Sequence, residues 1–216
     1  MKARLFPATS IWPPIDYELS DIKDQGLLQG QVLNAGCGWR DLSHLIEGEL
    51  TNQDLTWPGD KRENVHIFSP LHQIPRPDNY FDAVLCIAVL EHVINPDAVM
   101  KELTRVLKPG GTLVASVPFL QPEHKVPTDF QRYTRDGLEV LFVNEGLKVI
   151  DIQPLFTVYH TIYWICEEWL QLKNNIKYRV AKSTILPAIA FLAKKSSTCS
   201  DKIASAFRVV ATKPAS

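Results

Sequence analysis

The sequence has few cysteines and no long hydrophobic run. Among its 216 residues there are four cysteines, far apart and without a C-x-x-C pair: Cys37, Cys86, Cys166 and Cys199. Buried free thiols in a reducing compartment explain this usage best. No apolar stretch approaches the roughly 20 residues that a membrane-spanning helix needs. Pro7, Pro13 and Pro14 interrupt the N-terminal region, so we expect no signal peptide and a cytoplasmic protein.

The chain also lacks a strong overall charge. Its net charge of −1 gives no general attraction to nucleic acid, so we expect no nucleic-acid partner. The charge is uneven along the chain, since residues 171–216 hold nine of the 23 basic residues and a single acid, Asp201. A basic end of this kind favours anionic surfaces, but a solvated helix face explains it more simply.

A third glycine is missing from the most informative stretch, residues 31–40. Val32 and Leu33 read as the end of a buried strand, and Gly36 and Gly38 then allow a sharp turn with close approach to a ligand. A strand, a glycine turn and a helix in this order make the ligand crevice of open α/β sheets. The dinucleotide fingerprint needs a further glycine where Arg40 and Asp41 stand, so a nicotinamide dinucleotide fits poorly.

The regular elements that follow predict a mostly parallel sheet. Strands are expected over residues 50–55, 65–68, 81–90, 112–117, 147–152 and 204–212, with helices over 16–28, 41–46 and 135–142. Asn95 as N-cap and Pro96 at the first turn predict a helix that Lys108 to Gly111 ends. Strand, helix and strand at this spacing make a parallel βαβ unit.

Residues 157–200 carry no motif that we can place. Apolar residues from Val158 to Ile176 follow a helical stripe, and a second helix is expected from Ser183 or Thr184 to Lys195. We expect one domain over 1–216, with an N-terminal segment over 1–28 and a helical insertion over 157–200. The segment 183–195 is apolar with a basic end, so it covers the sheet or makes peripheral contact with a membrane.

Several motifs stand in order at the separations of one known family. They are Gly36-Cys37-Gly38, Phe81 to Val84, Leu90-Glu91-His92-Val93 and Arg105 to Gly111. Together they resemble the methyltransferase type 11 group of class I S-adenosylmethionine (SAM) dependent methyltransferases. The stretches 118–124, 127–130 and 132–134 resemble one bacterial branch of that group. The resemblance covers roughly residues 30–155.

This resemblance implies a Rossmann-like α/β fold. The expected sheet has seven strands, mostly parallel with an antiparallel last strand, and helices on both faces. It implies SAM as cofactor and assigns it these residues: Asn34, Ala35, Gly36, Cys37, Gly38, Asp54, Leu55, Leu71, His72, Ala88 and Val89. In this scheme Asp54 accepts the ribose hydroxyls, whereas the alternative is a turn acid before Trp57.

Two positions depart from the family pattern. A residue that is commonly acidic in the first motif is Asn34 here, which brings no charge to the SAM ammonium group. The position that often carries an acid near the adenine appears as Pro70. Both departures leave open a degenerate cofactor site.

The loop from Gln121 to Thr134 concentrates polar residues after the fifth strand. His124 is the predicted general base, since an imidazole takes up protons near neutral pH; the alternative is a histidine that orders a proline-rich loop. Asp129, Arg132 and Tyr133 are predicted to contact substrate, although Asp129 and Arg132 can equally pair with each other and Tyr133 can pack in the loop. The resemblance implies that Glu91 and His92 lie near the cleft; the alternatives are a cap on the following loop for Glu91 and a packing residue for His92, and for His92 we favour packing.

We therefore expect a SAM-dependent methyltransferase acting on a hydroxyl of a small molecule or saccharide. The sequence shows no metal-ligand spacing, Ser-His-Asp pattern or phosphate-binding loop, so we expect no metal. The rival hypothesis is a non-catalytic methyltransferase-like protein with an impaired SAM pocket. The sequence fixes neither the acceptor nor the oligomeric state.

Overall fold

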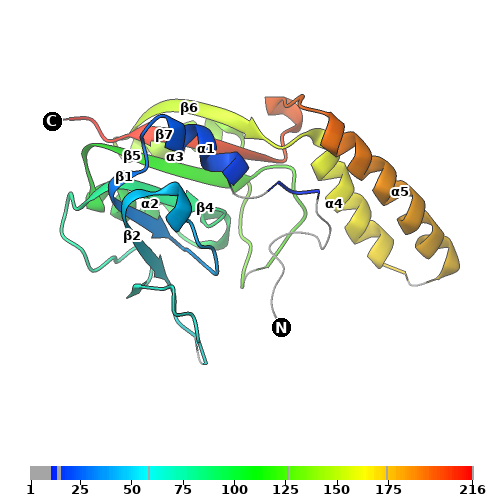
Figure 1. Cartoon of the computed structure of the whole chain (residues 1–216), viewed down its shortest axis with the longest axis horizontal. Coiled ribbons are helices and arrows are strands. Elements are labelled where there is room, and N and C mark those ends of the chain that lie inside the picture. Colours follow the sequence, from blue (N-terminus) through cyan, green and yellow to red (C-terminus); the bar gives the residue numbers. More distant parts are fainter. Residues whose placement is uncertain (1–10, 14–15, 58, 126, 174, 216) are drawn as a thin grey trace.

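A seven-stranded sheet forms the centre of the protein in the computed structural model, which describes residues 11–13, 16–57, 59–125, 127–173 and 175–215 (Figure 1). The strand order is β3-β2-β1-β4-β5-β7-β6. Strand β7 runs antiparallel to both of its neighbours, and the other adjacent strands pair in parallel. The predicted Rossmann-like sheet with an antiparallel last strand is confirmed.

The order of strands and α-helices along the chain is the predicted one, except at residues 41–46. The strands are β1 (Gln29–Ala35), β2 (Glu47–Asp54), β3 (Ile67–Phe68), β4 (Phe81–Ile87), β5 (Leu107–Pro118), β6 (Lys148–Leu155) and β7 (Ala206–Thr212). The α-helices are α1 (Asp16–Asp24), α2 (Pro96–Val106), α3 (Arg135–Asn144), α4 (Val158–Gln171) and α5 (Ile176–Lys195). Short 3-10 turns are η1 (Ser43–Leu45), η2 (Leu90–His92) and η3 (Asp201–Ile203).

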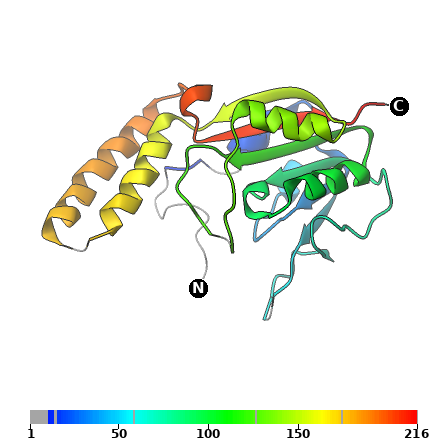
Figure 2. The same cartoon turned by 180° about the vertical axis from the view of Figure 1, so that it is seen from behind.

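Helices cover both faces of the sheet. Helix α1 and η1 lie on the face seen in Figure 1, while α2 and α3 lie on the opposite face in Figure 2. The core between the sheet and α2 includes Val99, Leu103 and Val106, the stripe expected from the sequence. The predicted cap is also present, because the Asn95 side chain accepts the Ala98 N–H at 3.1 Å.

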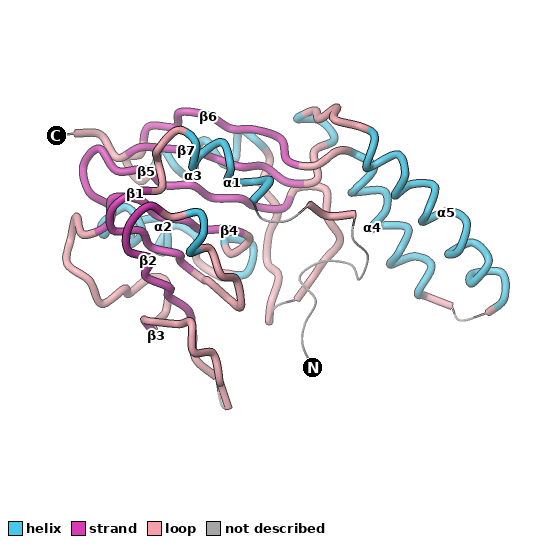
Figure 3. The backbone as a smooth tube through the Cα atoms, in the orientation of Figure 1, coloured by secondary structure: helices cyan, strands magenta, loops and turns pink. Residues whose placement is uncertain are grey.

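Helices α4 and α5 connect β6 to β7 and lie side by side as a hairpin that extends beyond the sheet (Figure 3). Tyr163, Leu170 and Leu186 are buried between them. Among the described helices, none has the length and apolarity to cross a membrane. The residues 1–10 of the predicted N-terminal segment lie outside the described residues.

Several predicted element boundaries are wrong. The helix expected over 16–28 ends at Asp24, and the strand expected over 81–90 ends at Ile87. The helix expected over 41–46 is only η1, because the Asp41 carboxylate binds the Ser43 N–H at 2.9 Å and β2 already begins at Glu47. The stretch 108–111 does not end α2 but lies inside β5, which begins directly after the helix. Helix α5 begins at Ile176 because the Asn175 side chain caps it.

Candidate active site

Gly36 and Gly38 follow β1 and form the predicted turn, with φ angles of +65° and +59°. A Cβ atom on Gly36 would lie 2.6 Å from a methyl carbon of Val89, so side-chain packing excludes it. A Cβ atom on Gly38 would meet no described atom within 4 Å. Gly36 is therefore required by packing, whereas Gly38 borders open space in which a ligand can approach the backbone.

Asp54 ends β2 and faces this glycine turn. Its Oδ2 atom accepts the Gly38 N–H at 2.8 Å, and its Oδ1 atom accepts the Leu55 N–H at 2.7 Å. The carboxylate is thus at the sheet edge where the resemblance puts the ribose hydroxyls. The same bonds also close a turn of the protein's own backbone, so the geometry is compatible with both roles considered for Asp54.

Asp54 has a further partner that the sequence analysis missed. The buried guanidinium of Arg62 pairs with Asp54 and with Asp60, and it lies 3.9 Å from the centre of the Trp57 ring. Burial lowers the pKa of Arg62, but the Asp60 and Asp54 carboxylates outweigh this effect and raise it. The open backbone at Gly38 and the nearby acid fit SAM, provided that Arg62 shares or releases Asp54.

Two buried amides hold the glycine turn against β2. The Asn34 side chain donates to Oδ1 of Asn52 at 2.9 Å, so it joins two strands instead of pointing at a ligand. Gln53 accepts the Gly36 N–H at 3.1 Å and donates to the Ser69 carbonyl at 2.5 Å. Gln53 was missed by the sequence analysis, and its only signal is a polar residue at the end of a strand.

The remaining predicted cofactor residues differ in exposure. Leu55 and His72 are exposed, whereas Ala35, Cys37, Leu71 and Val89 are buried. Burial, helped by the Asp54 charge, raises the pKa of Cys37 to about 11. Ala88 has a φ of +52°, which is uncommon for a residue with a side chain and turns the chain at the end of β4. The assignment of these residues to SAM stays a prediction.

The loop 121–134 is tied together by an ion pair. Both guanidinium Nη atoms of Arg132 donate to the Asp129 carboxylate, and Arg132 also donates to the Pro122 carbonyl at 2.9 Å. Asp129 accepts the His124 N–H at 2.7 Å. Burial raises the pKa of Asp129, but Arg132 and the His124 N–H outweigh this and lower it. These contacts favour the pairing alternative for Asp129 and Arg132.

Tyr133 packs against the core, and its buried hydroxyl has no hydrogen-bond partner in the described part of the chain. Burial, followed by the Glu91 charge, raises the pKa of its hydroxyl well above the usual value. A ligand or a water molecule would supply the partner that this buried hydroxyl lacks among the described residues.

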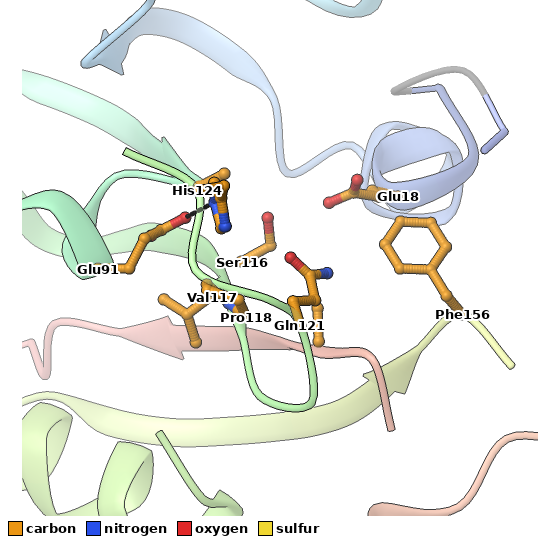
Figure 4. A pocket seen from close by; sticks show the side chains of 10 residues that line it. Glu18, Glu91, Ser116, Val117, Pro118, Gln121, His124 and Phe156 are labelled. Carbon is orange, nitrogen blue, oxygen red and sulfur yellow. Dashed lines mark ion pairs between the residues drawn. The ribbon is translucent and has the colours of Figure 1, made fainter. Parts of the chain in front are cut away.

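The loop brings His124 next to Glu91 and His92. The Nε2 atoms of His92 and His124 each lie 3.7 Å from Glu91 Oε1, and the two imidazole rings are 5.2 Å apart. Figure 4 shows the Glu91 and His124 side chains pointing toward each other. Burial lowers the pKa of His124, but the Glu91 carboxylate and the Pro122 carbonyl outweigh this effect and raise it.

A small cavity of about 20 Å³ opens beside this cluster, enough for one water molecule. It is lined by residues of α1 and β5, of the segment after β4 and of the loop 121–134. Among them are Glu18, Ala88, Glu91, Ser116, Gln121 and His124 (Figure 4). Burial raises the pKa of Glu18, against the opposing effects of Ser116 and Arg40. Glu18 was not expected at the site, because α1 precedes every motif.

Comparison with known sequences gives a consistent result. Residues 33–115 match the family described as "Methyltransferase domain". The ubiquinone/menaquinone biosynthesis C-methyltransferase UbiE of Vibrio campbellii is 33% identical over 143 residues, which cover 56% of this chain and 55% of that protein. The ubiquinone biosynthesis O-methyltransferase of Idiomarina loihiensis is 31% identical over 105 residues, 42% of this chain and 43% of that protein. The chain thus spans about half the length of these curated relatives.

Solved structures share the fold. A putative sarcosine dimethylglycine methyltransferase from Galdieria sulphuraria superposes with a TM-score of 0.62 at 16% identity, covering 92% of this chain and 84% of that chain. At this identity the similarity describes the fold alone.

Proposed function

We propose that this chain, whose residues 33–115 match a methyltransferase domain, transfers a methyl group from SAM to a hydroxyl of a small molecule or saccharide. The observation that carries the proposal is the edge of the sheet at which two kinds of group meet. An open glycine backbone with an acid follows β1 and β2, and the Glu91–His124 pair follows β4 and β5. Ligands of open α/β sheets bind at this edge.

In this proposal the cofactor binds at the glycine backbone and its acid, and the acceptor binds beside the Glu91–His124 pair. SAM supplies a methyl carbon that an adjacent positive sulfur activates. The protein's main task is then to align the acceptor oxygen with that carbon. In the reaction the carbon–oxygen bond forms as the carbon–sulfur bond breaks, and the hydroxyl proton passes to His124 in its proposed role as base.

Two observations bear on the choice of acceptor, the names of the relatives and the geometry of the site. The relatives' names include both carbon and oxygen acceptors, in the Vibrio and the Idiomarina proteins respectively. We favour a hydroxyl because the buried His124 lies beside a cavity at the proposed acceptor side, and a hydroxyl nucleophile benefits from such a base. The saccharide option rests on the resemblance of residues 118–134 to one bacterial branch.

One experiment tests the proposal directly. The protein is incubated with SAM labelled in its methyl group and with fractionated metabolites and glycans, and label transfer is measured. Calorimetry with SAM and with a nicotinamide dinucleotide runs in parallel. Labelled product that disappears in the Gly38→Val variant supports the proposal, while absence of SAM binding at millimolar concentration contradicts it.

A non-catalytic binding protein is the second candidate, and one observation favours it. Arg62 already pairs with the acid that the ribose would need, and Asn34 is committed to Asn52. If this candidate is correct, SAM will bind weakly or not at all, and replacement of Arg62 will restore binding.

A further inference from the structure

Glu91 carries a carboxylate that its two histidine neighbours, His92 and His124, do not satisfy by hydrogen bonds. Its side chain is fully buried, and neither oxygen receives a hydrogen bond from the described residues. Burying a carboxylate is costly unless a cation or several donors compensate it. The two imidazole nitrogens that face it, on His92 and His124, lie 3.7 Å away, which is too far for a good hydrogen bond.

The hydrogen bonds of the two histidines show which ring nitrogens face Glu91. Nδ1 of His92 lies 2.5 Å from the Thr128 carbonyl, and Nδ1 of His124 lies 3.1 Å from the Pro122 carbonyl. Since a carbonyl only accepts hydrogen bonds, the tautomer that satisfies both contacts carries its proton on Nδ1; the competing contact, from Arg132 Nη2 to His124 Nδ1, is longer at 3.5 Å. In the neutral rings, both Nε2 atoms therefore present lone pairs to the carboxylate.

These contacts also fix the positions of the rings. The Phe130 N–H donates to the Glu91 carbonyl at 2.8 Å, and the Thr128 hydroxyl donates to the His92 carbonyl at 3.1 Å. The Gln131 side chain bridges the carbonyls that flank η2. Backbone carbonyls that accept Nδ1–H are the usual outer partners of metal-binding histidines, because they set the tautomer and the ring orientation.

We propose that Glu91, His92 and His124 form a binding site for a divalent transition-metal ion of the Zn²⁺ class. One ligand atom from each of the three residues lies within 4.8 Å of the other two. Zinc bonds of roughly 2.0–2.2 Å in a tetrahedron place two ligand atoms about 3.3 Å apart. The two 3.7 Å separations therefore need to contract by about 0.4 Å, and the separation between the two histidines, which is at most 4.8 Å, by up to about 1.5 Å. The ion neutralises the buried carboxylate and satisfies both lone pairs.

The ligand types set the choice of ion. Two imidazoles and one carboxylate suit zinc and its first-row neighbours, whereas Mg²⁺ and Ca²⁺ prefer oxygen ligands. Three protein ligands leave a fourth position open, as in catalytic rather than structural sites. Because Glu91 and His124 also line the small cavity, this position faces a space that holds one water molecule or an acceptor oxygen.

A bound ion changes the part assigned to His124. As a ligand, His124 cannot serve as the base, and the ion itself would lower the pKa of a bound hydroxyl so that its proton passes to solvent. This consequence rests on the proposed function, whereas the metal site stands on its own geometry. The test therefore measures metal and SAM binding separately.

The experiment uses the full chain without a histidine tag, stripped with a chelator and titrated with ZnCl₂ in a calorimeter. Co²⁺ serves as a second probe, because its visible absorption reports coordination number. We expect one Zn²⁺ per chain, a tetrahedral or five-coordinate Co²⁺ spectrum, and a higher melting temperature with Zn²⁺. SAM titration of the metal-free protein tests the proposed function independently.

Variants decide whether these three residues hold the ion. His92→Ala, His124→Ala and Glu91→Gln should each weaken Zn²⁺ binding more than about 100-fold, since changes to outer partners alone cost about 10- to 100-fold. His44→Ala removes an exposed histidine and should change nothing. Circular dichroism checks the fold of each variant. Wild-type protein that binds no stoichiometric Zn²⁺, or binding that survives in folded His92→Ala and His124→Ala proteins, would overturn the site.

Discussion

The candidate site has two halves at one sheet edge: a cofactor half with Gly38 and Asp54, and an acceptor half with Glu91 and His124. The two halves compensate their charged groups in opposite ways. In the cofactor half, Asp54 binds two backbone N–H groups and the Arg62 guanidinium. In the acceptor half, the Glu91 carboxylate is more deeply buried and lacks a hydrogen-bond donor among the described residues. The first half is internally paired, whereas the Glu91 carboxylate of the second interacts with the buried Arg40 guanidinium only through its charge and receives no hydrogen bond from the described residues.

This difference predicts different responses to ligands. A ligand of the cofactor half must compete with Arg62, so part of its interaction with Asp54 replaces an existing one. A cation or donor in the acceptor half instead compensates a group that is otherwise costly to bury. We therefore expect a ligand contact in the acceptor half to stabilise the folded protein more than a ligand contact in the cofactor half.

The largest expected effect comes from Gly38→Val, which should abolish SAM binding while the protein remains folded. The added side chain would fill the open space above the turn, where the backbone must approach the ligand. SAM affinity is measured by calorimetry. Gly146→Val is the matched control, because Gly146 has a φ of +76°, also with no described atom within 4 Å of an added Cβ, and lies after α3. Unchanged affinity in Gly38→Val would remove the glycine turn from the cofactor site.

The second prediction concerns the acceptor half. His124→Ala should lower turnover by about 10²–10⁴, the usual contribution of a general base, with SAM affinity nearly intact. If His124 only orders the loop, His124→Gln should keep most of the activity, because an amide replaces the hydrogen bond to Pro122 but cannot take a proton.

Steady-state kinetics with an identified acceptor and SAM calorimetry separate the possibilities. Near wild-type turnover in both variants would exclude His124 from the mechanism. Loss of SAM binding in both variants would assign the loop 121–134 to the cofactor half and contradict its separate role in binding the acceptor. A parallel loss of turnover in His92→Ala would favour the ligand role over the base.

Asp54→Ala should have a smaller effect, confined to the cofactor half. A charge-assisted hydrogen bond contributes about 1.5–3 kcal/mol, so SAM affinity should fall about 10- to 150-fold if Asp54 accepts the ribose hydroxyls. Asp60→Ala is the control, since it removes the other acid that pairs with Arg62. A loss below about twofold in Asp54→Ala would assign Asp54 to the turn alone.

The sequence predicted those features of the molecule that depend on residues close together in the chain. The Asn95 cap and Pro96 began α2 as expected, and the glycine turn after β1 was confirmed because a positive φ leaves a recognisable residue type. The fold class followed from the order of such signals. Boundaries failed where a single side chain decided them, as at Asn175, which starts α5 before the apolar stripe indicates a new helix.

The contacts within the site could not be predicted in this way. Glu91 and His124 come from different loops, and their approach depends on Phe130 and Gln131 bonding to the backbone of η2. The Arg62–Asp54 pair depends on how the long connection from β2 to β3 folds back. Neither contact has a spacing that marks it, so residue types alone indicated candidates but not partners.

The smallest expected effect tests the comparison most directly. Arg62→Met removes the internal competitor of the ribose hydroxyls while keeping an apolar side chain over Trp57. Arg62 is buried but Asp54 keeps solvent contact, so we take the contribution of an exposed ion pair, up to about 1 kcal/mol, and expect SAM affinity to rise by up to about fivefold. Lys61→Met is the matched control, because it removes the same charge from an exposed neighbour.

Calorimetry with SAM distinguishes three readings of Arg62→Met. Tighter SAM binding than in Lys61→Met means that Arg62 competes with the ribose hydroxyls for Asp54, as expected for an internally paired cofactor half. Weaker binding means that Arg62 is itself part of the cofactor site and holds Asp54 in place for the ribose. An equal affinity in both variants would show that SAM does not use Asp54, and with Asp54→Ala it would reduce the cofactor half to the glycine turn.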